Sequence, residues 1–514
     1  MLTRYFFRIS TYILLLIFTV SCYSPRTDNL STVQITEIPD MTTYVPSLTE
    51  TPVSTQKPPH SSKTPEPGKG DQSRQANGAS QNLSFDIPAH SMDVILGRPT
   101  DKSITLSVLS YTPQTVIVSY GTTSGNYTSQ TDPFNLQTNV PQTIELTNLK
   151  PDTLYYYFLN GVENTFHTAR PSGSTFTFAI QADSHLDSNT NPQVYLQTLA
   201  NERADHPDFV IDLGDTFMTE KYKPYTAAEP QYLAQRYYMS QIAQTASLFL
   251  VLGNHDGEGA PRGNVGYETS TWAAGMRIKY FPNPESDGFY TGNPNPDSTV
   301  GELQDYYAWE WGDALFVVLD PYWYTPPING DSDQWNPTLG NEQYQWLKTT
   351  LESSPANWKF IFIHQLIGGM DKNGRGGIEI ADLYEWGGNN ADGSYSFEIQ
   401  RPGWDMPIHQ LLVANRVTAV FHGHDHLFAK EELDGIIYQE VPQPGASRIN
   451  DISSAAEYGY MSGVILGSPG YLRVTVKPDD VVVEYVRTYL PQDVKSGQEN
   501  GQVDCSYEIL PWID

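Results

Sequence analysis

The 514-residue chain is poor in cysteine and in positive charge, and each shortage excludes a class of protein. Two cysteines cannot build a multi-disulfide scaffold, so we expect a chain of this length to be held by packing, in more than one domain. Its 59 acidic residues outnumber 30 basic ones, a net charge of -29, which argues against nucleic acid and against an anionic membrane surface as partners.

The first residues have the pattern of an export signal. Arg4 and Arg8 precede an uncharged apolar run over 9–20, which is too short to span a bilayer comfortably. Cys22 follows Ser21, which resembles a bacterial lipobox, although Thr19 stands where that motif usually has Leu. We expect a bacterial extracytoplasmic protein, either attached to the membrane through a lipidated Cys22 or secreted with an ordinary signal (1–22). With Cys22 lipidated a disulfide framework is impossible, and Cys505 is expected to be a chance surface cysteine.

Two regions separate this signal from the larger part of the chain. Residues 23–86 are dense in Ser, Thr and Pro and contain few apolar residues, which is typical of a disordered linker. Residues 87–170 show short stretches of alternating apolar and polar residues, which predict a small antiparallel β-sandwich. The run 149–157 resembles the closing part of a fibronectin III-like domain. Nothing in the sandwich has a catalytic pattern, so we expect a positioning role.

From residue 175 to about residue 490, apolar strands alternate with helical segments, which predicts an α/β domain with mostly buried sheets. The long connection 442–470 is expected to act as a lid or binding loop, and residues 491–514 as a C-terminal tail. The expected strands are 176–182, 209–213, 248–252, 314–319, 360–363 and 417–421, with helices over 192–204, 231–245, 342–352 and 407–415 and hairpin turns at 434–435 and 478–480.

A polar motif follows each of five apolar strands. Ligands of open α/β sheets bind at the carboxyl ends of strands, so a site is expected there. Carboxylate, imidazole and amide groups bind divalent first-row metals, and no motif contains the cysteine that a thiolate site needs. One such motif alone is usually ordinary loop chemistry, but five in one order predict a metal site. They are Asp183-Ser184-His185, Gly214-Asp215, Gly253-Asn254-His255-Asp256, His364 and His422-Gly423-His424-Asp425-His426.

This order of motifs resembles the calcineurin-like metallophosphoesterase superfamily, over roughly residues 175–490. The resemblance implies a four-layer αββα sandwich and two divalent metal ions, of manganese, iron or zinc. It places one ion on Asp183, His185, Asp215 and His426, and the other on Asp215, Asn254, His364 and His424, with Asp215 bridging both. Two such ions lower the pKa of a bridging water and clamp the phosphoryl oxygens during in-line attack.

The same resemblance gives catalytic roles to the third motif. His255 would be the general acid or charge stabiliser for the leaving oxygen, with Asp256 as its orienting partner. A simple turn-capping carboxylate is the alternative for Asp256. His422, Asp425 and Asp320 match no ligand position and are expected to support the ligands or the fold.

The sandwich followed by this domain is also similar to purple acid phosphatases, with two departures. That group has Gly where His185 stands, and it has a tyrosinate ligand where this chain reads Thr216-Phe217-Met218. We therefore expect a general metallophosphoesterase site without a purple ferric ion. An aromatic cluster, Tyr322-Trp323-Tyr324 with Trp335 farther on, either walls a substrate groove or belongs to the packing.

The expected function is hydrolysis of small phosphomonoesters or phosphodiesters outside the cytoplasmic membrane, by in-line attack of a metal-bridging hydroxide. A nucleotidase or cyclic nucleotide phosphodiesterase is one alternative, but only 88 residues follow His426 (514 minus 426), and they lack the pattern of a large nucleotide-binding domain. A catalytically inert surface binding or adhesion protein is the alternative from another class. Seven intact ligand positions speak against inertness.

Overall fold

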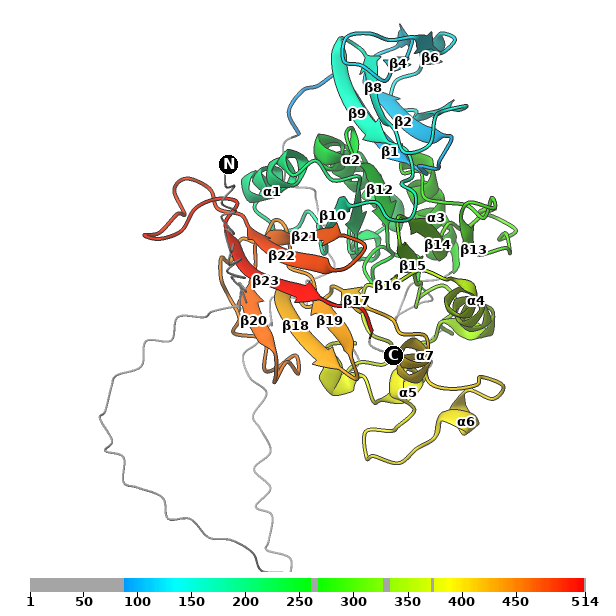
Figure 1. The fold of residues 1–514 in the computed structure, drawn as a ribbon, viewed down its shortest axis with the longest axis vertical. Coiled ribbons are helices and arrows are strands. Elements are labelled where there is room, and N and C mark those ends of the chain that lie inside the picture. Colours follow the sequence, from blue (N-terminus) through cyan, green and yellow to red (C-terminus); the bar gives the residue numbers. More distant parts are fainter. Residues whose placement is uncertain (1–86, 260–266, 327–332, 371–373, 513–514) are drawn as a thin grey trace, which may run out of the picture. The chain divides into compact units, whose positions relative to one another are not determined.

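The computed structural model describes residues 87–259, 267–326, 333–370 and 374–512 (Figure 1). The predicted signal peptide with its lipobox cysteine, and the predicted linker over 23–86, lie outside the described residues. None of the helices in this described part of the chain combines the length and the apolar character that a bilayer crossing requires.

The larger part of the chain is built on two sheets. A six-stranded sheet has the order β12-β11-β10-β21-β22-β23 and an eight-stranded sheet the order β13-β14-β15-β16-β17-β19-β18-β20. The first comprises β10 (Phe176–Gln181), β11 (Phe209–Asp212), β12 (Ser247–Leu250), β21 (Gly470–Val476), β22 (Val481–Arg487) and β23 (Val503–Ile509). The second comprises β13 (Thr291–Gly292), β14 (Tyr307–Trp311), β15 (Ala314–Val318), β16 (Trp358–Phe362), β17 (Ala419–His422), β18 (Leu427–Leu433), β19 (Ile436–Glu440) and β20 (Val464–Gly467).

The two sheets pack face to face through aromatic side chains. Phe178 and Phe209 of the first sheet meet Phe316 of the second, edge to face, with ring centroids 5.2 Å apart in both pairs. Such pairs add to the hydrophobic gain of burying the rings. The residues alternate along each strand, so the opposite face of each sheet is apolar as well and needs its own cover.

Helices supply that cover and complete four layers. On the first sheet lie α1 (Pro192–Ala204) and α2 (Glu229–Ala243), whose Tyr195 and Met239 pack with the strand residues Val210 and Leu248. On the second lie α4 (Gly340–Ser353) and α7 (Ile408–Ala414), packed in the same way on the outward face. The predicted αββα sandwich is confirmed.

A smaller all-β region precedes these sheets. It contains a three-stranded sheet of β1 (Met92–Gly97), β2 (Ile104–Ser110) and β7 (Gln142–Leu146), and a four-stranded sheet of β5 (Ser129–Gln130), β4 (Ser119–Gly121), β8 (Leu154–Leu159) and β9 (Val162–His167), with the pair β3 (Gln114–Val116) and β6 (Phe134–Leu136). Arg236 of α2 donates to the backbone oxygen of Ser107 at 2.8 Å, and the Tyr157 hydroxyl donates to that of Gln244 at 2.7 Å. These bonds join the all-β region to α2 and its C-terminal end. A fibronectin III-like identity for this region stays a prediction.

The prediction of a C-terminal tail over 491–514 is wrong for the residues of β23, because this strand pairs with β22 and extends the first sheet. Cys505 of β23 is buried with 2% of its surface exposed, which overturns the expected surface position of this cysteine. The sequence also gave no sign of α3 (Tyr267–Tyr280) or β14. Two predicted hairpins, β18 with β19 and β21 with β22, are confirmed.

Candidate metal centre

All five polar motifs begin at strand ends, as predicted. Asp183 follows β10, Asp215 follows β11, Asn254 follows β12, His364 follows β16 and His424 follows β17. β10, β11 and β12 run parallel, and so do β15, β16 and β17, so their carboxyl ends meet at one edge of each sheet. Facing sheets with this polarity place all five motifs in one region.

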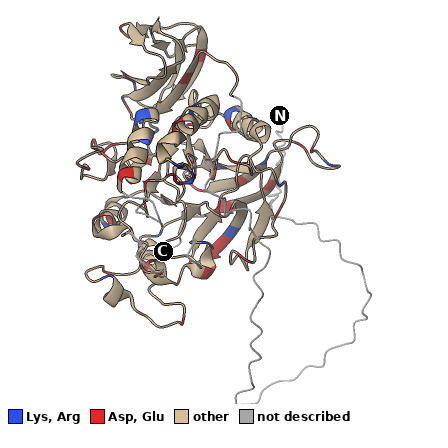
Figure 2. Cartoon of the chain, turned by 180° about the vertical axis from the view of Figure 1, so that it is seen from behind, with Lys and Arg blue, Asp and Glu red and all other residues tan. Residues whose placement is uncertain are grey.

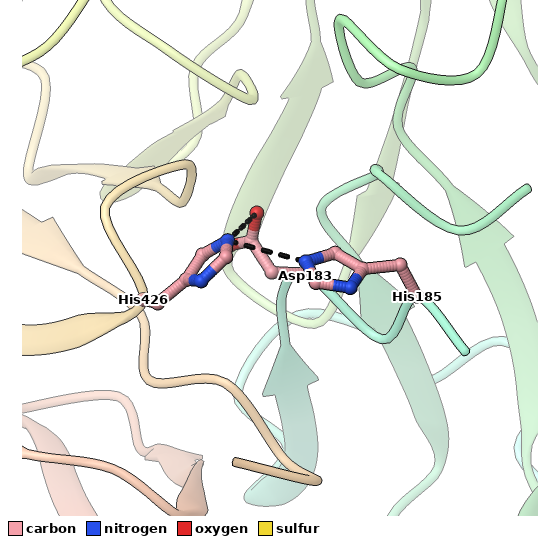
Figure 3. A group of neighbouring side chains, drawn as sticks. All are labelled: Asp183, His185 and His426. Atoms are coloured by element: carbon pink, nitrogen blue, oxygen red, sulfur yellow. Dashed lines mark hydrogen bonds and ion pairs between the residues drawn. The ribbon is translucent and has the colours of Figure 1, made fainter. Parts of the chain in front are cut away.

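The first ligand group consists of Asp183, His185 and His426, each of which offers an atom within 4.8 Å of the others. The Nε2 atoms of His185 and His426 are 3.2 Å apart, and His426 Nε2 is 3.3 Å from Asp183 Oδ1 (Figure 3). Asp183 Oδ1 is buried and accepts no hydrogen bond from any described residue. A buried carboxylate oxygen without a donor, facing two imidazole nitrogens, fits a bound cation.

The second ligand group consists of Asp215, His364 and His424, again within 4.8 Å of one another. Asn254 joins it, because its Oδ1 lies 3.1 Å from His364 Nε2, and Asp215 Oδ2 lies 3.4 Å from the same atom. The Nδ1 of His364 donates to the Leu213 carbonyl at 2.8 Å, which turns Nε2 toward the group as an acceptor. The structure thus gathers into two groups all seven residues to which the resemblance gave a ligand role. Asp215 falls in the second group, and its bridging of both ions stays a prediction.

The electrostatics of both groups suit a cation. Burial raises the pKa of Asp183, but the neighbouring His426 lowers it to about 2. Burial also raises the pKa of Asp215, but the neighbouring His364 and His255 outweigh it and hold this pKa well below the ordinary range. Although burial lowers the pKa of His364, the charge of Asp215 raises it to about 10. Asp215 thus favours a positive charge on His364, and a bound metal would take the place of that proton.

The ligand loops have unusual backbone conformations. Asp183, Asp215, His424 and His426 all have positive φ, at 58°, 55°, 86° and 60°. Residues with a Cβ rarely adopt this region, and such strain is stored mainly at functional sites. Gly253 permits a further close approach, because a Cβ there would lie 2.0 Å from the Asp215 backbone nitrogen.

The expected pairing of Asp256 with His255 is corrected by the structure. The Asp256 carboxylate accepts from four backbone N–H groups, those of Asp215, Thr216, Phe217 and Gly253, at 2.8 to 3.1 Å. It therefore fastens the second motif to the third, which is the turn-capping alternative. Burial, followed by the charge of Asp215, raises the pKa of Asp256 to about 7.

Glu220 takes the place expected for Asp256. It lies in the short 3-10 helix η1 (Thr219–Lys221), and its carboxylate contacts Nδ1 of His255, whose Nε2 is 3.9 Å from Asp215 Oδ2. Burial raises the pKa of Glu220, but the hydrogen bond to His255 lowers it to about 2, so Glu220 is ionised. The available sequence signal was an acidic residue five positions after Asp215, on the loop from the same strand.

Further carboxylates orient the residues around the ligands. His422 Nδ1 lies 2.8 Å from Glu440, and Asp425 accepts from Arg375 at 3.0 Å. Asp320 accepts from the backbone nitrogen of Tyr322 at 2.7 Å. These contacts agree with the supporting roles expected for His422, Asp425 and Asp320.

The aromatic cluster divides between the two roles considered for it. Tyr322 lines a pocket beside Asn254 and Glu220, whereas Trp335 is buried and packs edge-on against Tyr384. Phe217 lies in the segment where purple acid phosphatases have their tyrosinate. Its ring stacks on that of Tyr232, with the ring centroids 4.2 Å apart.

Comparisons with known proteins agree with this geometry. The family model described as calcineurin-like phosphoesterase matches residues 176–428. A solved structure of PhoD covers 83% of this chain and 92% of its own, with a TM-score of 0.59 and 15% identity. A solved structure of purple acid phosphatase PPD1 from yellow lupin (Lupinus luteus) seeds covers 81% of this chain and 74% of its own, with a TM-score of 0.53 and 17% identity. At these identities the two structures bear on the fold alone. A search of curated protein sequences finds no match.

Proposed function

Because residues 176–428 form a calcineurin-like metallophosphoesterase domain, we propose that the protein is an exported, metal-dependent hydrolase of small phosphomonoesters or phosphodiesters. The observation that carries this proposal is the convergence of two ligand groups at the strand ends of facing sheets. In Figure 2 the basic residues are scattered singly, which supports a small substrate over a nucleic acid.

Asp183, His185 and His426 would hold one metal ion, and Asn254, His364 and His424 the other, with Asp215 shared between them. Manganese, iron and zinc all suit this set of carboxylate, imidazole and amide donors. When bound, the two ions supply an activated water and charge neutralisation for the phosphoryl oxygens.

The chain's own contribution to the chemistry centres on His255. Its Nδ1 contacts the ionised Glu220, so its Nε2 faces the ligand groups, 3.9 Å from Asp215. A histidine so oriented can give a proton to the departing oxygen as the phosphorus–oxygen bond breaks. Glu220 fixes the orientation of the ring through this contact, in the way that a buried carboxylate orients a catalytic imidazole.

The test is activity of the purified mature protein, loaded with Mn²⁺, Zn²⁺ or Fe²⁺, toward aryl phosphate mono- and diesters. Asp215→Asn removes the shared charged ligand and should reduce kcat/KM by about 1,000-fold or more, because metal binding and electrostatic stabilisation fail together. Asp132→Asn, an exposed position in the all-β region, is the matched control and should keep full activity. Equal activity in Asp215→Asn, or no hydrolysis with any metal, would overturn the proposal.

Export and attachment form a separate part of the proposal, supported by Arg4, Arg8, the apolar run over 9–20 and the position of Cys22. Cells grown with a fatty-acid analogue should label the protein, and Cys22→Ser should abolish the label. A disulfide between the two cysteines of the chain, or retention in the cytoplasm, would contradict this part alone.

A further inference from the structure

A pocket adjoins the metal centre on the side of His255. It is lined by Glu220 and Asn254, and by Tyr322, Thr325, Gln365 and Ile367. Asn254 belongs to the second ligand group and Glu220 contacts His255, so one wall of the pocket is the machinery to which His255 belongs. In the proposed reaction His255 faces the departing oxygen, so the group attached to that oxygen extends toward this pocket.

The pocket has one fixed aromatic wall. The ring centroid of Tyr322 is 6.4 Å from that of His364. The backbone nitrogen of Tyr322 donates to the Asp320 carboxylate at 2.7 Å. The Tyr322 hydroxyl donates to Gln365 at 3.3 Å, and a Cβ on Gly259 would come within 3.3 Å of the Tyr322 Cβ. Held from these sides, the ring presents a flat surface, and Pro321, Pro337 and Ile367 add apolar lining.

The charge of the pocket has one sign. Of its lining residues, all within the described part of the chain, none is Lys or Arg, and Glu220 is the charged one. Glu220 has two basic partners, His255 and the partly exposed Lys221 at 3.0 Å, but neither of them lines the pocket. An anionic group that entered here would lose water and meet a carboxylate.

We propose that this pocket binds the leaving group of the phosphoester and selects one that has a flat apolar face and no negative charge. The inference rests on the proposed function. In the reaction, water adds its oxygen to phosphorus, the bond from phosphorus to the leaving oxygen breaks, and that oxygen receives a proton by way of His255. The product is an uncharged alcohol or phenol. Esters whose leaving group carries further phosphates, such as nucleoside triphosphates, are poor substrates.

The first experiment compares phenyl phosphate with 4-carboxyphenyl phosphate on the Mn²⁺-loaded mature protein. We expect kcat/KM to be lower for the carboxylated ester by about tenfold or more, because its carboxylate would enter beside Glu220 and no Lys or Arg lines the pocket to pair with it. Phenyl phosphate should also exceed methyl phosphate by more in the wild type than in Tyr322→Ala, and Tyr322→Phe, which keeps the ring, should restore the difference.

The second experiment adds a positive charge. Thr325 lines the pocket and is partly exposed, so Thr325→Lys should raise the ratio of kcat/KM for the carboxylated ester to that for phenyl phosphate by about tenfold. Thr325→Gln, which loses the same hydroxyl but adds no charge, should leave the ratio unchanged. Since both variants are tested with the same two esters, the different acidity of the phenols cancels. Metal content should equal that of the wild type.

Two results would overturn the pocket proposal alone: hydrolysis of both esters with equal kcat/KM in the wild type, or a ratio that Thr325→Lys does not change. Failure to hydrolyse any phosphoester, with both metals bound, would instead contradict the proposed function.

Discussion

The two ligand groups contain the same kinds of donor but differ in how firmly the fold holds them. In the second group His364 is fully buried and hydrogen-bonded to a backbone carbonyl, and Asp215 Oδ1 accepts from the His255 backbone nitrogen at 2.7 Å. In the first group the His426 side chain is 26% exposed, and the Nδ1 atom of His185 is supported by a 3.4 Å contact with Asp187. The second group is therefore the more rigid one.

This difference follows from how the loops meet. Gly253 lies against the Asp215 backbone, and Asp256 fastens both loops with four hydrogen bonds. The first group has a weaker connection, in which the His424 backbone nitrogen donates to Asp183 Oδ2 at 2.9 Å. Ligand loops fastened on several sides keep their geometry without the ion, whereas partly exposed ones depend more on it.

The largest effect is expected where the second group is tightest. In Gly253→Ala the added Cβ would lie 2.3 Å from Asp215 Oδ1, so the two loops must separate. We expect kcat/KM to fall by about 100-fold or more, since small displacements of catalytic groups are costly, with about 1–3 kcal/mol lost from the free energy of unfolding. Gly275→Ala in α3 is the control, because nothing lies within 4 Å of that position. A fully active Gly253→Ala would show that the loops are not tightly held.

A chelator tests the comparison directly. Metal should leave the wild type in two phases, with the ion of the first group about tenfold faster, because the His426 side chain is partly exposed whereas that of His364 is buried. His426→Ala should leave the slow phase and one ion per protein, measured by mass spectrometry of the bound metal. A single phase, or an unchanged fast phase in His426→Ala, would abolish the distinction between the groups.

The pairing of Glu220 with His255 should affect turnover without affecting either ion. Glu220→Gln removes the carboxylate that orients the His255 ring, so kcat should fall by about tenfold for esters with poor leaving groups, and less for good ones. In a His255→Ala background the same change should cost little more, because the two residues act as a unit. Loss of metal in Glu220→Gln, or additive losses in the double variant, would contradict this role.

Sequence patterns predicted most of the fold because buried strands are continuous apolar runs and their ends carry the polar motifs. The helix over 192–204 is identical to α1, since Asn191 caps it and Pro192 starts it. What escaped prediction depends on tertiary packing. α3 has no strong amphipathic pattern, and Tyr307–Trp311 reads as an aromatic stretch that only the neighbouring strands turn into β14.

The site shows the same division. The seven proposed ligands were found because each stands beside a strand end, where chain order fixes their place. The supporting carboxylates were not predicted, because they are distant in the sequence from the histidines that they contact. Glu220 lies 35 positions from His255, and Glu440 lies 18 positions from His422. Asp256 was assigned to its sequence neighbour, whereas three of its four donors lie on the loop after β11, which meets the loop of Asp256 only in the folded protein.

The smallest effect is expected outside both groups, at Glu202 of α1. Both of its carboxylate oxygens are buried and without a hydrogen-bond partner among the described residues, and burial raises its pKa well above the ordinary value. The folded protein thus keeps a proton that the unfolded chain loses near pH 4.3, so stability is fully present below that pH. As pH rises toward the folded pKa, this stability is lost progressively. Glu202→Gln cannot ionise, so its stability relative to the wild type should rise between pH 5 and pH 7 in denaturant titrations, with metal content unchanged. A parallel pH dependence in the two proteins would show that Glu202 finds a charged partner in solution.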